Sequence, residues 1–216
     1  AAAKVGGMKI VHTIHGLAFH RYEKWWRNRV YIGLERSAAC RTDAIISVAD
    51  AMTAQALAAG IGTPEQYTTI YSGMEVESFI RRPDETDEVR AALRLPKNAV
   101  VVTQISRLAE LKGHEFLLKV AREIPNERVC FLFVGDGRLR RQIEATIASL
   151  DLAGRFRLTG LVCPDQIPAL LHASDILVHC SLREGLARAL PQAMLAGLPV
   201  VSFDVDGAAE VIDSDT

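Results

Sequence analysis

The sequence has few cysteines, no long apolar run and almost no excess charge, and each absence excludes a class of protein. The cysteines are scattered without a C-x-x-C pair, which indicates neither a zinc site nor a disulfide framework, and we expect buried free thiols at Cys40, Cys130, Cys163 and Cys180. No run reaches the ~18 apolar residues that a membrane span needs, and no signal peptide is visible, which favours a cytoplasmic protein. A net charge of −1 argues against a general binder of nucleic acid.

What is present is a regular alternation of apolar runs and helical segments. After residue 98 the alternation predicts a mostly parallel sheet with helices on both faces, its strands at Ala99–Ile105, Val129–Val134, Arg155–Leu158, Asp175–His179 and Val200–Phe203. Before it lie three further predicted strands, at Lys9–Thr13, Asp43–Ala49 and Tyr67–Tyr71. The predicted fold is therefore α/β with two Rossmann-like lobes: an incomplete N-terminal lobe over residues 1–80, a charged linker over 81–98 and a C-terminal lobe over 99–216.

The stretch Cys180–Val201 lies between two of these strands and contains few polar residues. Glu184 precedes a predicted helix, and Gln192 follows eight residues later. Eight residues of helix rise about 12 Å, which is roughly the reach of a sugar, a diphosphate and a ribose. Because proline fits only the first turn of a helix, Pro191 predicts that the regular helix begins late, near Arg188–Pro191.

This stretch reads E-G-L, then Q-A-M, then G-L-P-V-V, and it resembles the retaining, nucleotide-sugar-dependent glycosyltransferases of family 4 (glycosyl transferases group 1), which have the GT-B fold. Gln192 departs from the family pattern, which has a second glutamate there. A neutral amide accepts a hydrogen bond more weakly than a carboxylate does, so the resemblance implies softer ribose binding.

Other stretches carry the same resemblance. S-R-L at Ser106–Leu108 with K-G at Lys112–Gly113 matches a family motif, as do V-G-D-G at Val134–Gly137 and V-H-T-I-H-G at Val11–Gly16. The loop after residue 203 contains a D-x-D triplet, Asp204-Val205-Asp206, that could hold Mg²⁺ or Mn²⁺. It resembles instead the family's (D/T)-x-G-G-x-x-E loop through Gly207 and Glu210, which we favour.

The resemblance implies that a sugar passes from a nucleoside diphosphate to an acceptor hydroxyl with retention, without a metal or another cofactor. By the matched motifs, four residues are catalytic: Arg107 and Lys112 at the leaving diphosphate, Glu184 at the sugar hydroxyls and His15 at the sugar from the acceptor side. The implied donor-binding residues are Gly73, Gly135, Asp136, Leu161, Gly185, Leu186, Ala187 and Gln192, with the amides of Gly185–Ala187 at the phosphates. The implied acceptor is a glycan or a lipid-linked sugar in polysaccharide, glycolipid or cell-envelope glycan synthesis.

Two further interpretations concern surfaces. The stretch His20–Arg41 is basic and aromatic, and it fits either peripheral contact with an anionic membrane at the inner face or a surface helix with one aromatic face in the core. We favour the second. His114 is expected at the surface, in the first turn of its helix.

A GT-B enzyme normally needs a longer chain, so we expect the start of the first lobe and the end of the second to lie outside these 216 residues. The fragment alone should bind nucleotide weakly and catalyse nothing. A non-catalytic nucleotide-binding module is the alternative, to which the incomplete first lobe and Gln192 both lend weight. A phosphorylase-like or synthase activity on storage glucans stays open.

Overall fold

The computed structural model describes residues 7–212, which form two compact units. Unit 1 is Ala1–Gly73, Glu184–Ala187 and Asp206–Thr216, and unit 2 is Met74–Arg183 and Arg188–Val205. The division falls after Gly73 and not at the predicted linker. Two short segments from late in the sequence join the first unit.

Unit 1 contains a parallel sheet of three strands in the order β1 (Val11–Ile14), β2 (Ala44–Ser47) and β3 (Tyr67–Thr69). Its helices are α1 (Trp25–Ala39) and α2 (Asp50–Ala58), with 3-10 turns η2 (Pro64–Gln66) and η5 (Asp206–Glu210). The core is formed by apolar side chains from the strands and α2, including Ile45 and Met52. All three predicted strands are present.

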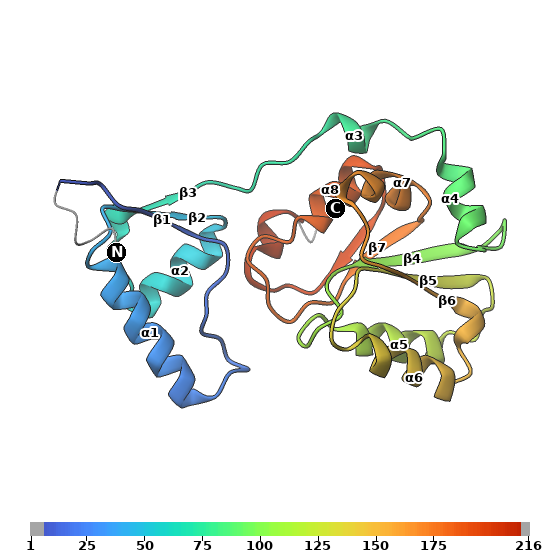
Figure 1. Cartoon of the computed structure of the whole chain (residues 1–216), viewed down its shortest axis with the longest axis horizontal. Coiled ribbons are helices and arrows are strands. Elements are labelled where there is room, and N and C mark those ends of the chain that lie inside the picture. Colours follow the sequence, from blue (N-terminus) through green and yellow to red (C-terminus); the bar gives the residue numbers. More distant parts are fainter. Residues whose placement is uncertain (1–6, 213–216) are drawn as a thin grey trace. The chain divides into compact units, whose positions relative to one another are not determined.

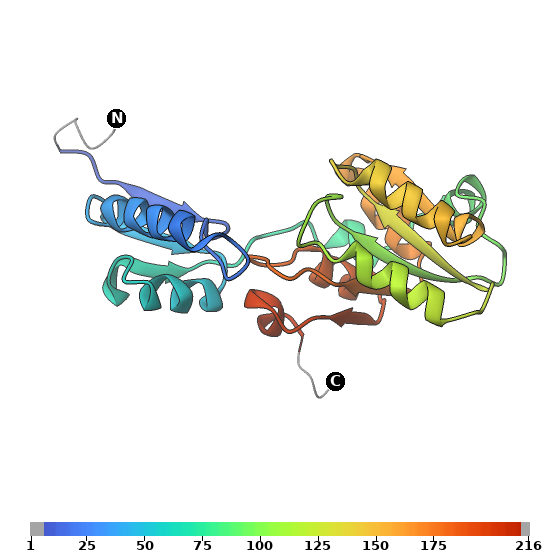
Figure 2. The same ribbon diagram turned by 90° about the horizontal axis from the view of Figure 1, so that it is seen from below.

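Unit 2 contains a parallel sheet of five strands in the order β6-β5-β4-β7-β8. The strands are β4 (Val100–Ile105), β5 (Val129–Val134), β6 (Phe156–Gly160), β7 (Ile176–His179) and β8 (Val200–Ser202). The α-helices are α3 (Glu77–Ile80), α4 (Thr86–Ala92), α5 (His114–Glu123), α6 (Arg140–Ser149), α7 (Ile167–His172) and α8 (Ala189–Leu195), with 3-10 turns η3 (Ala153–Arg155) and η4 (Pro164–Gln166). Figures 1 and 2 show helices on both faces of this sheet.

Strand β5 is apolar throughout because both of its faces are buried. Phe131 and Phe133 pack into the cluster that contains residues of α5 and α6, whereas Leu132 and Val134 pack into a cluster on the other face. Because helices cover both faces of a parallel sheet, its central strands need no polar side. The predicted fold class follows from this pattern.

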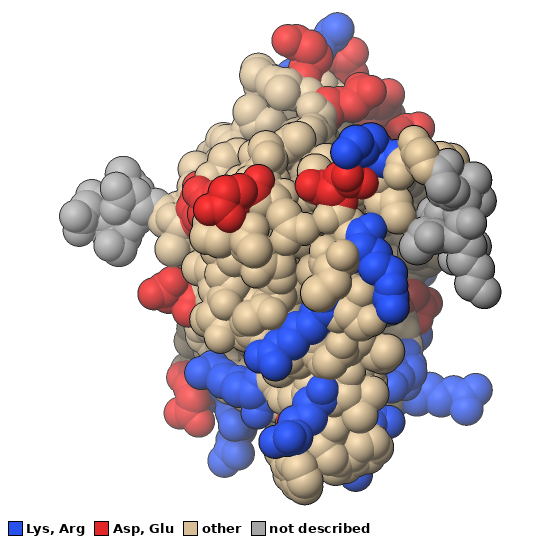
Figure 3. Space-filling model, turned by 90° about the vertical axis from the view of Figure 1, so that its left-hand side faces the viewer, with Lys and Arg blue, Asp and Glu red and all other residues tan. Residues whose placement is uncertain are grey.

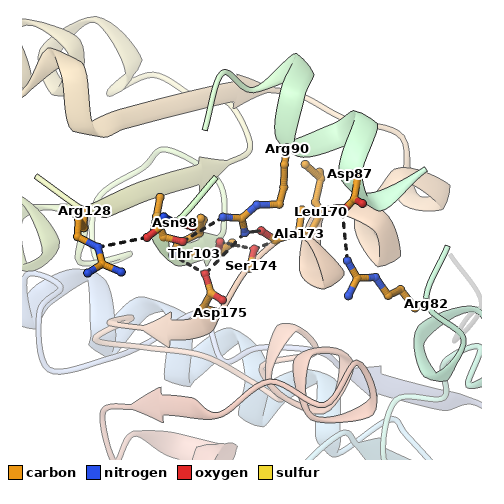
Figure 4. A network of polar contacts seen from close by, with 12 residues as sticks. Arg82, Asp87, Arg90, Asn98, Thr103, Arg128, Leu170, Ala173, Ser174 and Asp175 are labelled. Carbon is orange, nitrogen blue, oxygen red and sulfur yellow. Dashed lines mark hydrogen bonds and ion pairs between the residues drawn. The ribbon is translucent and has the colours of Figure 1, made fainter. Parts of the chain in front are cut away.

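Helix α4 lies in the segment predicted as a linker, yet it is part of unit 2. Arg90 donates to the carbonyl oxygens of Ala173 (2.7 Å) and Ala99 (3.0 Å) and pairs with Asp175 at 3.7 Å. Figure 4 shows these contacts, together with Ser174 bonded to Thr103 at 2.6 Å. The helix is thus fastened to the start of β4 and to the turn that follows α7.

Two expectations about burial need correction. Trp25 and Trp26 at the start of α1 are 74% and 49% exposed, so neither tryptophan lies in the core. Of the four cysteines, Cys130 and Cys180 are buried, whereas Cys40 and Cys163 are exposed. Within residues 7–212 no helix has the length and apolar character to cross a membrane.

Candidate functional site

In unit 2, three loops meet at the carboxyl edge of the sheet, after β4, β5 and β7. The backbone N–H of Leu108 donates to the carbonyl of Asp136 (2.9 Å), and that of Leu139 donates to Leu108 (3.0 Å). Leu182, after β7, donates to Leu111 at 2.8 Å. Ligands of open parallel sheets bind at this edge, and the loops there are joined through their own backbones.

Two glycines let these loops approach closely. A Cβ on Gly113 would lie 2.0 Å from the carbonyl oxygen of Cys180, and Gly113 also has a φ of +73°. A Cβ on Gly135 would lie 2.2 Å from the carbonyl oxygen of Ser106. Gly135 likewise has a positive φ, of +136°, so glycine is required at both positions by packing and by the backbone conformation.

A buried polar network holds the loop that carries Arg107 and Lys112. Gln104 donates from Nε2 to the carbonyl of Lys112 at 2.6 Å, and Ser106 Oγ lies 3.1 Å from Nε2 of His114. His114 is only 2% exposed, which corrects the surface position predicted for it. Burial, followed by the charge of Lys112, lowers the pKa of His114 from 6.5 to about 4, so the imidazole is neutral at pH 7.

Sequence reasoning missed this network. Its visible signal was Gln104, a polar residue inside an otherwise apolar strand, where a buried amide needs hydrogen-bond partners. Nothing in the local pattern indicated that His114 would pack edge-on against Phe133, at a centroid distance of 5.1 Å.

The other predicted residues of unit 2 lie at or near the same edge. Arg107 is exposed and Lys112 is half-buried. The carboxylate of Asp136 accepts from the N–H of Gly137 (2.7 Å) and from Arg140 (3.1 Å), which holds it within its own loop. Leu161 directly follows β6 and is 88% exposed.

Unit 1 brings together His15 and the turn Glu184–Ala187. His15 follows β1 and is exposed, and its carbonyl oxygen would lie 2.3 Å from a Cβ on Gly185. Leu186 packs against the core of this unit, and Ala187 is 5% exposed. The glycine after Glu184 is therefore required by close packing against the end of β1.

Helix α8 begins at Ala189, as the position of Pro191 predicted, and Pro191 is its third residue. The estimate of about 12 Å from Glu184 to Gln192 assumed continuous helix, and the helix does not extend back to Glu184. The amides of Gly185–Ala187 precede the helix and do not form its first turn. Gln192 is half-buried, and Gly73 is exposed, with open space where a Cβ would be.

Comparison with known families decides the identity of the chain. The family described as "Glycosyl transferases group 1" matches residues 85–216, which is more than half of the chain. The chain belongs to the group 1 glycosyltransferases. The family described as "Glycosyltransferase Family 4" matches residues 1–78.

Two curated relatives match almost the whole chain. It is 28% identical over 220 residues to the 2-deoxystreptamine glucosyltransferase of Streptomyces kanamyceticus, covering 98% of this chain and 57% of that protein. It is 29% identical over 211 residues to the UDP-Gal:alpha-D-GlcNAc-diphosphoundecaprenol alpha-1,3-galactosyltransferase of Escherichia coli, covering 95% and 54%. The chain thus spans little more than half the length of these relatives.

Solved structures confirm the fold. The Anabaena protein HepE in complex with UDP-glucose is 27% identical, with a TM-score of 0.83 over 95% of this chain and 56% of that one. WaaG, a glycosyltransferase involved in lipopolysaccharide biosynthesis, has a TM-score of 0.81 at 18% identity, covering 95% and 59%, and supports the fold alone. The predicted α/β lobes of the GT-B type are confirmed.

Proposed function

We propose that the intact protein is a retaining glycosyltransferase that moves a hexose from a UDP-sugar to an acceptor hydroxyl. The observation that carries the proposal is the carboxyl edge of unit 2, where Arg107 and Lys112 lie on a loop joined by backbone hydrogen bonds to both neighbouring loops. Uridine as the base is supported by HepE, which was solved with UDP-glucose, and by the Escherichia coli relative, whose name includes UDP-Gal.

In this proposal the two cations act on the leaving group. The acceptor oxygen bonds to the anomeric carbon as the bond from that carbon to the diphosphate breaks, and the hydroxyl proton passes to the departing diphosphate. Both electrons of the broken bond remain with the diphosphate, and Arg107 and Lys112 stabilise the charge that develops there. The buried network of Gln104 and His114 supports this assignment, because Gln104 donates to the backbone carbonyl of Lys112 and His114 contacts Ser106 in the same loop. A loop backbone that is held in place before the reaction limits the rearrangement needed when the charge develops.

The remaining roles follow from the family motifs. Glu184 orients the hydroxyls of the donor sugar, and the turn Gly185–Ala187 offers its amides to the phosphates. Gln192 accepts from the ribose, and His15 contacts the sugar from the acceptor side. The other donor-binding residues are Gly73, Gly135 and Asp136, together with Leu161 at the base.

The test is a transfer and donor-hydrolysis assay on the intact protein with UDP-glucose and UDP-galactose. Lys112→Ala should lower kcat by roughly 10²- to 10³-fold, the usual loss when a group stabilising transition-state charge is removed. Glu184→Ala should abolish transfer. The matched control is Lys119→Ala, an exposed lysine on α5, which should leave the rate unchanged. UDP binding without turnover over a panel of acceptors would support the non-catalytic module instead.

A second proposal concerns α1, whose exposed surface corrects the sequence expectation. Four apolar side chains of α1 are exposed, namely Trp25, Trp26, Val30 and Leu34. Four exposed cations accompany them in the sequence: Arg21, Lys24, Arg27 and Arg29. Figure 3 shows Lys and Arg gathered on the lower part of the face that it presents. We propose peripheral contact with an anionic membrane, at the cytoplasmic face where a lipid-linked acceptor would be met.

The membrane proposal is tested by sedimentation with vesicles containing phosphatidylglycerol. Four glutamine substitutions at these cations should reduce binding by roughly 10²- to 10³-fold, since each cation contributes on the order of 1 kcal/mol near an anionic surface. The matched control carries four substitutions in unit 2, at the exposed residues Lys97, Lys119, Arg122 and Arg128. Equal loss in both variants, or no binding by the native protein, would refute this contact.

A further inference from the structure

The carboxylate of Asp206 joins two segments that are far apart in the sequence. One oxygen accepts from the backbone N–H of Glu184 at 2.7 Å, and the other accepts from the side-chain amide of Gln55 on α2 at 2.8 Å. Asp206 has a φ of +48°, a left-handed conformation that aspartate and asparagine tolerate better than most residues. Both oxygens of this carboxylate therefore have protein partners.

The turn η5 that begins at Asp206 is itself anchored. Glu210 accepts from the N–H groups of Asp50 and Ala51, both at 2.8 Å, at the N-terminus of α2. The N–H of Gly207 donates to the carbonyl of Gly185 at 3.3 Å, and a Cβ on Gly207 would lie 2.6 Å from that oxygen. Asp206 thus contacts Glu184 from a turn held at both of its ends.

These contacts act on the backbone on both sides of Glu184. The Asp206 carboxylate fixes the N–H of Glu184, and Gly207 contacts the carbonyl of the next residue, Gly185. Gly185 is also packed against the carbonyl of His15. A charged acceptor forms a shorter and stronger hydrogen bond than a neutral one, so Asp206 is the strongest of these restraints.

We infer that Asp206 is a positioning residue that orients Glu184 toward the donor sugar. The inference rests on the proposed function, in which Glu184 binds the hydroxyls of that sugar. The Asp206 carboxylate does not touch the donor in this scheme. Its loss should therefore weaken contacts with the sugar while leaving those with the nucleotide unchanged. Displacement of a positioned group by about 1 Å can lower its effect by a factor near 10².

The experiment uses ligand-detected saturation-transfer NMR on the intact protein, with UDP-glucose and UDP as separate probes. Asp206→Asn keeps the shape and the tolerance for positive φ but removes the charge. We expect saturation of the glucose protons, relative to the uracil protons, to fall by about fivefold, because a neutral acceptor holds the Glu184 amide less firmly. UDP affinity should change by less than about twofold by the same reasoning.

Asp43→Asn is the matched control. Asp43 lies in the same unit and likewise accepts from one backbone N–H, that of Ile10 at 2.8 Å, and one side-chain nitrogen, that of Lys9 at 2.8 Å. It precedes β2, at the opposite end of that strand from Asp50. A selective loss of glucose saturation in Asp206→Asn but not in Asp43→Asn supports the inference, and the same loss in both variants overturns it.

Two further outcomes separate the inference from the proposed function. A native protein that binds UDP-glucose, with unchanged glucose saturation in Asp206→Asn, overturns the inference and leaves the proposed function intact. A native protein that binds neither UDP nor UDP-glucose overturns both. If Asp206→Asn does not fold, Gln55→Leu removes the other partner of the same carboxylate from an exposed position on α2, and a selective loss of about twofold is expected there.

Discussion

The neutral imidazole of His114 lies beneath the loop that carries the two predicted phosphate-binding cations. It is buried against Phe133 and reaches Ser106 through Nε2. A charged imidazole in this place would lose its hydration and would face Lys112. The residue therefore links the stability of the loop to pH.

The expected pH dependence has a definite sign. The folded pKa of His114 is about 4, below the ordinary 6.5, so the unfolded chain takes up the proton first as the pH falls. This contribution to stability is fully present above pH 6.5 and is lost as the pH falls toward about 4. Between pH 7 and pH 5 the loss should be about 2 kcal/mol, measured by urea unfolding. His114→Gln should show a correspondingly flatter profile; an equally steep profile in that variant would assign the loss to other groups.

Gly113 tests whether the close approach of the loops matters for stability. Gly113→Ala places a methyl group 2.0 Å from the carbonyl oxygen of Cys180 in a left-handed backbone. We expect a loss of about 3 kcal/mol in the free energy of unfolding, from strain plus displacement of the β7 loop. Gly154→Ala is the control, since open space surrounds that position and its φ is not positive, and it should change stability by less than about 0.5 kcal/mol.

Among the elements, α2 depends on a residue more than 150 positions away. No side-chain cap is formed by Ala49, the residue before the helix, and Glu210 from η5 accepts from the first two N–H groups instead. A carboxylate here also opposes the positive end of the helix dipole. The turn and the helix therefore stabilise each other.

Glu210→Gln should weaken this contact by about 1 kcal/mol, the usual value of a helix cap. Amide hydrogen exchange of Asp50 and Ala51 should accelerate accordingly, while amides near the end of α2 change little. Glu35→Gln, in the middle of α1, serves as the control in the same unit. Unchanged exchange at Asp50 and Ala51 would show that water replaces the carboxylate without loss.

For the whole molecule, the proposed donor class predicts a ranking of ligands. Because a ligand that binds only the folded state stabilises it, UDP-glucose at ten times its Kd should add about 1.4 kcal/mol and raise Tm by several degrees. GDP- and ADP-sugars should give smaller shifts at the same concentration. A larger shift with GDP- or ADP-sugars would contradict uridine as the base.

The amino-acid sequence by itself determined the strands, their parallel pairing and the family. Apolar runs such as Val129–Val134 and breaks such as Pro191 act through neighbouring residues, so they can be recognised in the chain. Only the tertiary structure decided that His114 is buried, that Trp25 is exposed and that Asp206 holds Glu184. Burial of His114 and the contact of Asp206 depend on partners elsewhere in the chain, and exposure of Trp25 on no described segment covering it. A local pattern carries no information about which distant segment will pack against it.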